Sequence, residues 1–481
     1  MKNKKILSAL LIAVLLLSIF RLEAFANSAR RLWEGVSMTG AVVADRNCPV
    51  EIENEKLTFD ISEFPSSYYE KEDDFLAYSG RVTAEYTFYN PADYNVTAKL
   101  VFPFGSYPSY EPHEYNENTG MLEYSDDTDK YGIWVNGEEI AHEIRHTLSD
   151  IGDFDINKDM GLIKDDFIKD GFYTPSLTVT KYTYEMSGIN KEEYHAASAG
   201  TDIGAFDRKR KFWLEDASGY DWLSDEKCRL GMWADNGIKI NLYVIGEPLK
   251  EAPDWKFYKD GGNEDGAEID GKMSLLSTKT LSFKELALSS FREGGRVSET
   301  DWYNASVAFL NKCEIEKFGV IKIDGTGGLD ISERLERWYE YEITLKPGEK
   351  IVNTIEAPLY PSIDLSYDPG VYGYTYLLSP ASTWAKFGKL DININTPFYM
   401  TECDKEGFVK TGSGYFFTSD GLPDGELNFS LSESPNPKTK QNGMGIIYFF
   451  FLLILGFVPY VVGALAVIIV IILILGRKRK K

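Results

Sequence analysis

Residues 81–105 read RVTAEYTFYNPADYNVTAKLVFPFG and carry the clearest structural signal of this 481-residue chain. Apolar and polar residues alternate in two runs, with the apolar positions at Val82, Ala84, Tyr86 and Phe88 and then at Val96, Ala98, Leu100 and Phe102. The intervening residues 90–93 (NPAD) favour a turn. Alternation with a period of two on both sides of a turn predicts a β-hairpin with one buried face.

Similar alternation recurs along the chain and predicts a mainly β fold of the α+β class. Strand patterns occupy residues 50–61, 132–140, 338–345, 390–394, 414–418 and 427–431. Asn136 and Gly137 suit a tight turn, and residues 346–349 (KPGE) suit a type II turn. Helical spacing is found at 283–292 and 301–314.

Short strands separated by Gly, Pro and Asn turns indicate β-sandwich-like lobes rather than a doubly wound sheet. We expect an N-terminal β-sandwich-like domain at 27–180, a mixed helical middle region at 181–330 and a C-terminal β-rich region at 331–434. A linker at 435–445 follows, with the sequence PNPKTKQNGMG.

Four segments of the chain carry a resemblance to known protein families. RVTAEYTFYNPADYNVTAKLVFPFG (81–105) and GIWVNGEEI (132–140) resemble an uncharacterised family of bacterial exported proteins, which is catalogued as a domain of unknown function. YEYEITLKPGEKIVNTIEAPLYPS (339–362) and YLLSPASTWAKFGKLDINI (376–394) resemble the C-terminal half of that family. The first segment is also similar to the β-sandwich domain shared by vault and inter-α-trypsin proteins. The resemblance implies a secreted β-rich module and carries no catalytic residue across.

Both ends of the chain carry targeting signals. Lys2, Lys4 and Lys5 precede an apolar run, and residues 24–26 (AFA) fit a cleavage site, so we expect a signal peptide at 1–26. The uncharged stretch at 446–475, which starts at Ile446 and ends at Leu475, is long enough to cross a bilayer as a helix. The basic tail at 476–481 (GRKRKK) marks the cytoplasmic side. We therefore expect a single-pass protein of the cell membrane with residues 27–445 outside.

The amino-acid composition argues against some classes of partner and of scaffold. A formal net charge of −23 argues against a nucleic-acid partner, because such binding needs a cationic surface. The cysteines are few and show neither CxxC nor Cys/His spacing, which indicates neither a disulfide-built scaffold nor a structural zinc site. They are Cys48, Cys228, Cys313 and Cys403. Four cysteines allow three disulfide pairings, and the sequence does not choose among them.

One stretch has the residues of a zinc peptidase. His142-Glu143-Ile144-Arg145-His146 is an HExxH sequence, in which a helix would put both imidazoles on one face and let Glu143 polarise a zinc-bound water. Arg145 stands where such peptidases usually have an uncharged residue, and no third ligand stands out. On a strand, His142 and His146 would lie about 13 Å apart, too far to share a metal. We favour a polar strand here and keep a zinc site at His142 and His146 as the alternative.

A second stretch has the spacing of a calcium loop. Its positions 1, 3, 5 and 12 are filled by Asp155, Asn157, Asp159 and Asp166. Met160 stands where the turn glycine belongs, and position 12 is Asp rather than Glu. We favour a plain acidic loop and keep a calcium site as the alternative.

A third motif precedes the apolar stretch. Residues 436–440 (NPKTK) resemble an NPxTN-type sortase motif, although Lys440 stands where Asn or Gly is expected. A spacer in front of the membrane is the simpler interpretation of Asn436 to Lys440, and a sortase partner is the alternative.

The sequence contains no convincing serine or cysteine triad and no phosphate-binding loop. We therefore expect a membrane-anchored extracellular protein with a non-catalytic role in binding, adhesion or the envelope. Its extracellular ligand is not identified by the sequence, and neither calcium nor zinc is firmly assigned. The alternative is a membrane-anchored zinc metallopeptidase that uses HEIRH at 142–146.

Overall fold

The computed structural model describes most of the chain between residues 32 and 440. The described residues are 32–33, 38–39, 41–43, 47–65, 78–105, 113–116, 121–124, 131–148 and 160–440, without 194–195, 206–207, 216, 218, 260–266, 294–296 and 324–328. The expected signal peptide and the expected span at 446–475 lie outside them. No helix in these ranges is long and apolar enough to cross a membrane. A mainly β fold is confirmed, because strands dominate over the helices α3 (Phe283–Ala287) and α4 (Glu299–Cys313).

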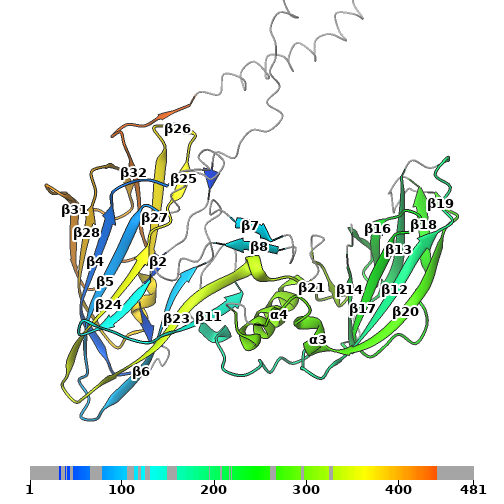
Figure 1. Cartoon of the computed structure of the whole chain (residues 1–481), viewed down its shortest axis with the longest axis horizontal. Helices are drawn as coiled ribbons and strands as arrows, with labels where there is room; N and C mark the ends of the chain where they lie inside the picture. The colour runs from blue at the N-terminus through cyan, green and yellow to red at the C-terminus, as the bar shows by residue number, and fades with distance from the viewer. Residues whose placement is uncertain are drawn as a thin grey trace, which may run out of the picture.

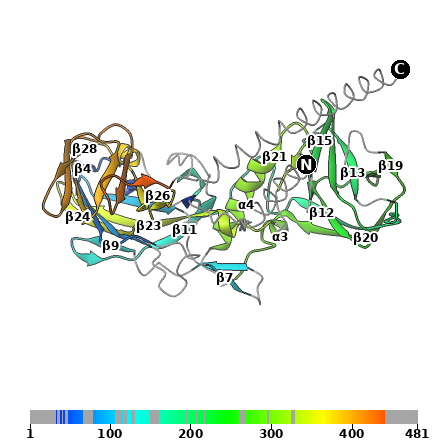
Figure 2. The same cartoon turned by 90° about the horizontal axis from the view of Figure 1, so that it is seen from above.

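The strands form two β lobes, and the helices belong to the second lobe, on the side that faces the first (Figures 1 and 2). The first lobe combines residues from 32–148 with residues 335–440, and the second lies within 160–331. The second lobe is thus an insertion between β11 (Glu143–Leu148) and β23 (Leu335–Leu345), which pair with each other. Segments that we expected in separate N-terminal and C-terminal regions therefore share one lobe.

One layer of the first lobe is an eight-stranded sheet of order β10-β9-β24-β5-β4-β28-β31-β30. Its strands are β4 (Glu51–Ile61), β5 (Gly80–Tyr89), β9 (Gly132–Val135), β10 (Glu138–Glu139), β24 (Lys350–Pro358), β28 (Phe387–Asn395), β30 (Val409–Lys410) and β31 (Gly414–Asp420). The tight turn between β9 and β10 is confirmed, since Asn136 and Gly137 have φ angles of 51° and 82°.

The opposing layer contains two smaller sheets, of orders β11-β23-β6-β3 and β1-β25-β27-β32-β29, with β2 also paired to β27. Their remaining strands are β1 (Leu32–Trp33), β2 (Met38–Thr39), β3 (Val42–Val43), β6 (Val96–Gly105), β25 (Ser362–Asp364), β27 (Val371–Leu377), β29 (Tyr399–Cys403) and β32 (Leu427–Ser432). Ala41 lies where the chain passes from one small sheet to the other. Its N–H donates to the Tyr86 hydroxyl (3.2 Å), and its carbonyl accepts from Trp384 Nε1 (3.0 Å). Inward side chains of all three sheets form one apolar core.

The buried alternation at 81–105 is confirmed, but the expected hairpin is wrong. The inward residues of β5 and β6 all belong to the common core. The two strands do not pair with each other, because β5 lies between β4 and β24 while β6 lies between β23 and β3. Residues 90–95 therefore form an arch that carries the chain across the core from one layer to the other.

A second arch lies beside the first. β23 and β24 also belong to opposite layers, so residues 346–349 connect the layers rather than close a hairpin. The Asn90 side chain is fully buried, and its Nδ2 donates to the carbonyls of Tyr94 (2.9 Å), Leu345 (3.1 Å) and Lys346 (3.1 Å). The Asn90 backbone exchanges two further hydrogen bonds with the 346–349 turn. Asn90 thus joins the two arches.

The second lobe has its own cores and includes both helices. A six-stranded sheet of order β20-β12-β17-β14-β22-β21 shares one core with a five-stranded sheet of order β15-β16-β13-β18-β19. The strands are β12 (Thr178–Ser187), β13 (Ala197–Gly204), β14 (Arg210–Leu214), β15 (Gly219–Ser224), β16 (Lys227–Trp233), β17 (Lys239–Gly246), β18 (Trp255–Lys259), β19 (Glu268–Ile269), β20 (Lys272–Ser282), β21 (Glu314–Ile315) and β22 (Val320–Ile321). Helices α3 and α4 form a second core with the six-stranded sheet, and Ser282 and Ser298 cap them. The expected domain boundary near residue 180 falls inside β12.

A buried ionic cluster connects β11 with the start of α4. Arg145, which is 7% exposed, donates through Nη2 to Asp301 Oδ1 (3.1 Å) and through Nη1 to Asp165 (3.0 Å). Asp301 Oδ2 also accepts from the backbone N–H of His146 (3.0 Å). This cluster links the helices to the first lobe, and removal of either Arg145 or Asp301 would leave the other as a buried, uncompensated charge.

All four cysteines lie within the described ranges, and none forms a disulfide. Cys48 and Cys403 belong to the first lobe, whereas Cys228 and Cys313 belong to the second. The structure therefore contains none of the three pairings that the sequence allows.

Replacing Asn90 with alanine should lower the free energy of unfolding by roughly 2–4 kcal/mol, because three carbonyl groups lose their common donor in a buried site. Urea denaturation followed by tryptophan fluorescence measures the change. Asn190→Ala is the matched control, since Asn190 is exposed: its Nδ2 donates to the exposed carboxylate of Glu193 (3.2 Å), and its Oδ1 accepts from the exposed N–H of Glu192 (3.2 Å). That variant should lose at most about 1 kcal/mol. Equal losses in the two variants would contradict the role of Asn90.

Candidate functional site

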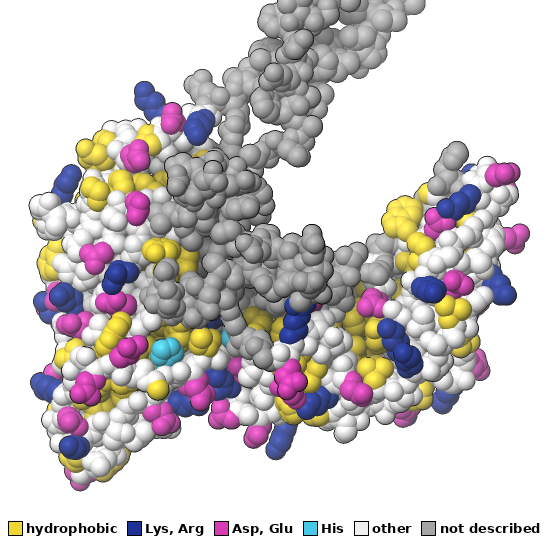
Figure 3. Space-filling model, viewed as in Figure 1, with side chains coloured by type: hydrophobic (Ala, Val, Ile, Leu, Met, Phe, Trp, Pro, Cys, Tyr) yellow, Lys and Arg dark blue, Asp and Glu magenta, His cyan; other side chains and the backbone are white. Residues whose placement is uncertain are grey.

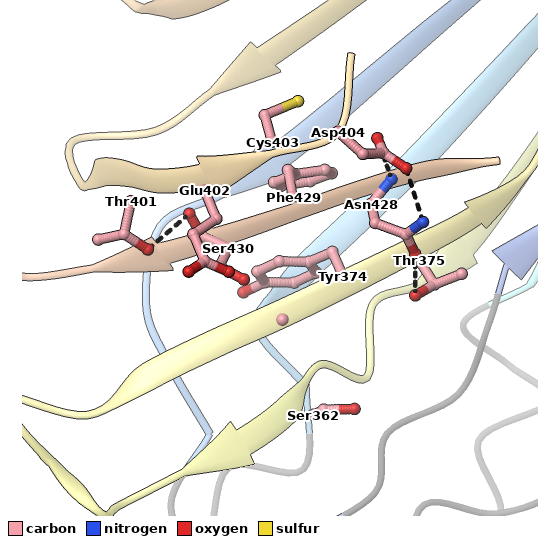
Figure 4. Close-up of a pocket in the computed structure, with 11 residues that line it drawn as sticks. Ser362, Tyr374, Thr375, Thr401, Glu402, Cys403, Asp404, Asn428, Phe429 and Ser430 are labelled. Atoms are coloured by element: carbon pink, nitrogen blue, oxygen red, sulfur yellow. Dashed lines mark hydrogen bonds between the residues drawn. The ribbon is translucent and has the colours of Figure 1, made fainter. Parts of the chain in front are cut away.

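A groove of about 700 Å³ lies on the outer face of the small sheet that contains β25, β27, β32 and β29 (Figure 4). We call it the outer groove. It is lined by Ser362, Gly373, Tyr374, Thr375, Thr401, Glu402, Cys403, Asp404, Asn428, Phe429 and Ser430. These residues come from separate stretches of the chain, which strand pairing brings together.

The groove is hollow because a row of small residues crosses three adjacent strands. Ser362 of β25 pairs with Gly373 of β27, and Gly373 pairs with Ser430 of β32. Glu402 of β29 is the next residue in this row. A Cβ at Gly373 would meet its nearest atoms, Ser430 Oγ and Ser362 Cβ, only at 3.8 and 3.9 Å, so the glycine leaves real space.

Polar groups line one end of the groove in fixed positions. Asn428 donates through Nδ2 to Asp404 Oδ2 (2.8 Å) and through its backbone N–H to Asp404 Oδ1 (2.9 Å). The Thr375 hydroxyl donates to Asn428 Oδ1 (2.8 Å). This network orients the amide and the carboxylate, because each is held by more than one hydrogen bond (Figure 4).

Glu402 differs from Asp404 because none of the described residues forms a hydrogen bond or ion pair with its exposed carboxylate. The Thr401 hydroxyl beside it donates to the Ser430 carbonyl (3.3 Å). A carboxylate that has no partner in the protein can accept hydrogen bonds from a ligand. Glu402 is thus the most available acceptor of the outer groove.

The reverse side of the same strands is held rigidly by buried tyrosines. The Tyr374 hydroxyl donates to Ser79 Oγ (2.7 Å), and the Tyr376 hydroxyl donates to Glu55 Oε1 (3.2 Å). Tyr376 also lies 3.3 Å from the Tyr86 hydroxyl of the opposite layer. Strands β27 and β4 are therefore fixed to each other behind the groove.

Glu55 is an unusual group for such a core because it is 1% exposed. Burial, opposed in part by hydrogen bonds of Tyr86 and Tyr376, raises the pKa of Glu55 to about 7. Glu55 Oε2 finds no hydrogen-bond partner among the described residues. The carboxyl is therefore neutral in mildly acidic solution and charged in alkaline solution.

The chemistry of the outer groove suits binding rather than a nucleophilic reaction. Cys403 is its only thiol, and burial raises the pKa of that thiol above its ordinary value. An activated cysteine needs a lowered pKa, so Cys403 is not prepared as a nucleophile. The remaining groups are hydroxyls, an amide and carboxylates, which form hydrogen bonds without activation.

The HExxH segment is a strand, as the favoured interpretation predicted. Glu143 and His146 lie in β11, and His142 directly precedes it. The His142 ring contacts the Tyr339 ring edge to face at 4.4 Å, whereas Arg145 belongs to the buried ionic cluster. The helical geometry that a shared zinc ion requires is absent from this segment. Within the described ranges, no group of three or more His, Cys, Asp and Glu side chains could hold a metal ion.

The calcium-loop residues Asp155, Asn157 and Asp159 lie outside the described residues. Asp166 is described, and its carbonyl accepts from Asn304 Nδ2 (3.1 Å). Residues Met160–Leu162 between them form a single 3₁₀ turn. Calcium binding at this stretch stays a prediction.

The sortase-like motif is tied to the first lobe. Its central residues form β33 (Lys438–Thr439), which pairs with β26 (Tyr367–Asp368). The Lys440 N–H also donates to the Ser366 carbonyl (2.6 Å). Sortase cleavage after Thr439 stays a prediction, and it would require this pairing to open.

Sequence reasoning did not identify any residue of the outer groove. One signal was available, because Gly373 interrupts a strand pattern, VYGYTYL, that is otherwise rich in aromatic and β-branched residues. A glycine inside a strand often marks a close approach of another group.

Comparisons with known proteins add little. No family model matches the chain, and no curated protein matches it. Among solved structures, a candidate nutrient-binding protein of Legionella pneumophila subsp. pneumophila matches 84% of this chain and 72% of its own, with 10% sequence identity and a TM-score of 0.32. A TM-score this low supports no argument about fold or function.

The stability of the protein should depend on the titration of Glu55. The folded chain binds this proton more tightly than the unfolded chain, whose pKa is near 4.5. The stabilising contribution is therefore complete below about pH 4.5 and is lost as the pH rises through about 7. Between pH 5 and 8, the free energy of unfolding should fall by up to about 3 kcal/mol from this group.

Urea denaturation at a series of pH values checks this dependence. Glu55→Gln should flatten the profile and make the protein more stable than the wild type at pH 8, because a neutral amide has no charge to desolvate. Glu85→Gln, on the exposed face of the neighbouring strand β5, should leave the slope unchanged. A wild-type slope that survives in Glu55→Gln would show that another group is responsible.

Proposed function

We propose that this protein is a membrane-anchored extracellular binding protein that holds a hydroxyl-rich ligand, such as a segment of an envelope glycan, in the outer groove without transforming it. The observation that carries the proposal is the row of Ser362, Gly373 and Ser430 next to Glu402, whose carboxylate is bound by none of the residues that the structure describes. The space above this row admits a ligand of substantial size, because pockets of 300–1,000 Å³ are typical for small molecules.

The ligand chemistry follows from the lining. The lining offers many hydrogen-bond acceptors and few positive charges that could neutralise an anion. The acceptors are the hydroxyls of Thr375 and Thr401, the amide of Asn428 and the carboxylate of Glu402. A polyhydroxylated ligand complements such a surface, since each of its hydroxyls both donates and accepts. An anionic ligand is disfavoured by Glu402 and Asp404.

The overall charge distribution agrees with this choice of ligand. On the face shown in Figure 3, basic side chains are interspersed with acidic ones instead of forming one cationic patch. The chain as a whole carries a formal charge of −23. Nucleic acid remains an unsuitable partner for such a surface.

Anchoring to the cell membrane rests on the sequence of residues 446–475. The pairing of β33 with β26 supports a short tether, because the described chain is attached to the first lobe up to Lys440. The residues between Lys440 and Ile446 can reach roughly 20 Å when extended. In this proposal the first lobe, with its outer groove, stays close to the envelope. The resemblance to exported proteins of unknown function agrees with this location.

Filling the outer groove should weaken glycan binding. Gly373→Leu places a side chain in the open space of the row and should weaken binding to cell-envelope glycans at least tenfold, as measured on a glycan array and by calorimetry. Gly219→Leu is the matched control, because Gly219 also lies in a strand and a Cβ there meets nothing within 4 Å. Glycan binding by the wild type that persists in Gly373→Leu would move the site elsewhere. Failure of the wild type to bind any hydroxyl-rich ligand would refute the proposal.

The anchor makes a separate prediction. The full chain should stay with membranes during alkaline carbonate washing, should dissolve in detergent, and should keep its basic tail in an intact-mass measurement. A chain that ends at residue 445 should be released in soluble form. A mature protein that ends at Thr439 and is attached to the cell wall would instead support sortase processing.

A further inference from the structure

An exposed tyrosine continues the outer face of β29 beyond Glu402. Tyr399 pairs with Ser432 of β32, and Glu402 pairs with Ser430 of the same strand. Residues that are two apart in a strand project from the same side, so Tyr399 and Glu402 share the outer face in adjacent rows about 7 Å apart. Tyr399 is 39% exposed. The outer groove therefore leads directly to an accessible aromatic side chain.

A lysine of the opposite layer holds this ring. Lys410 Nζ lies 5.2 Å from the centroid of the Tyr399 ring, which is a cation–π contact. Lys410 belongs to β30, the edge strand of the eight-stranded sheet, whereas Tyr399 belongs to β29, the edge strand of the small sheet. The contact therefore joins the two layers at one edge of the first lobe.

A second hollow lies on the other side of Tyr399. Its volume is about 430 Å³, and we call it the end pocket, because it lies where β4 and β28 end and β31 begins. Its lining includes Pro397, two residues before Tyr399, and Gly412, two residues after Lys410. Two residues span at most about 7 Å. The pair of Tyr399 and Lys410 thus lies between the end pocket and the outer groove, whose lining includes Thr401.

The end pocket repeats the chemistry of the outer groove. Asn395 Nδ2 donates to Asp60 Oδ1 (2.8 Å), which orients the carboxylate as another amide does in the outer groove. A Cβ at Gly412 would meet nothing within 4 Å, so the pocket is open on that side. Its remaining polar side chains are hydroxyls, from Ser62, Thr396 and Ser413.

An aromatic ring between two polar hollows matches the chemistry of a sugar chain. A pyranose ring has hydroxyls at its rim and C–H groups on its faces, so the rim forms hydrogen bonds while a face packs on an aromatic ring. Such packing removes apolar surface of both rings from water. Hollows of about 700 and 430 Å³ together exceed the upper limit of about 1,000 Å³ that is typical of a site for one small molecule.

We infer that the outer groove, Tyr399 and the end pocket form one binding surface for a glycan chain of several sugar residues. One sugar ring packs on the exposed part of the Tyr399 ring, which Lys410 holds, and its neighbours in the chain bind in the two hollows. Carboxylates on both sides, from Glu402 and Asp60, favour a neutral chain. This inference rests on the proposed function and adds that the ligand is a polymer, with Tyr399 as its stacking subsite.

Calorimetric titration of the full chain in lipid nanodiscs tests the length of the site, with empty nanodiscs titrated as the blank. The probes are neutral oligosaccharides of two and six residues, built from glucose, N-acetylglucosamine, galactose or mannose. In at least one series, the hexasaccharide should bind at least tenfold tighter than the disaccharide, because it also reaches Tyr399 and the end pocket. Equal affinity for both lengths would overturn this inference and leave the proposed function standing. Absence of binding in every series would refute the proposed function itself.

Variants locate the subsite. Tyr399→Ala should weaken hexasaccharide binding at least fivefold and leave disaccharide binding unchanged, whereas Tyr399→Phe should bind like the wild type because it keeps the ring. Tyr94→Ala is the matched control, since Tyr94 is also an exposed tyrosine of the first lobe, at 58%. Gly373→Leu should weaken the binding of both lengths, which separates loss of the outer groove from loss of the subsite. A hexasaccharide affinity that Tyr399→Ala leaves unchanged, or that Tyr94→Ala lowers equally, would overturn the assignment.

Discussion

The buried amide of Asn90 connects two arches of the first lobe. Each arch takes the chain across the core, from a strand of one layer to a strand of the other. β5 and β6 run in opposite layers, and so do β23 and β24. At both crossings the chain must bend away from its own sheet, which leaves backbone carbonyls without a strand partner. Asn90 Nδ2 satisfies carbonyls in both arches, at Tyr94, Leu345 and Lys346. Asn90 thereby joins an arch that precedes the second lobe in the sequence to an arch that follows it. The second lobe is an insertion between these two arches.

Local features of the fold could be read from the sequence, whereas the pairing of strands could not. The inward residues at Val82–Phe88 and Val96–Phe102 were recognised because burial alternates with a period of two in any strand. The hairpin was wrong because the same pattern arises when each strand finds its neighbours elsewhere in the chain. The outer groove was missed for the same reason, since Ser362, Gly373, Ser430 and Glu402 become neighbours only through long-range pairing. At 142–146, the HExxH motif would need a helix to bind zinc. The segment is a strand instead, because it follows the Asn136–Gly137 turn and pairs with β23.

The core of the first lobe holds the floor of the outer groove in place. The outer groove lies on β27, whose inward tyrosines bond Ser79 and Glu55 in the core, so the floor of the groove is fixed before a ligand arrives.

The arrangement of the first lobe depends on the arch at residues 90–95. The distance between its two flanking strands, β5 and β6, tests most directly whether the arch exists. Spin labels at Glu85→Cys and Thr97→Cys, introduced after the four native cysteines are replaced by alanine, report on exposed positions of β5 and β6. If the strands lie in opposite layers, the labels project from opposite outer faces, and pulsed EPR should give a separation above roughly 20 Å, because stacked sheets are about 10 Å apart before the labels are added. A hairpin would place the two positions within about 8 Å on one face, and strong dipolar broadening at that distance would contradict the architecture described above.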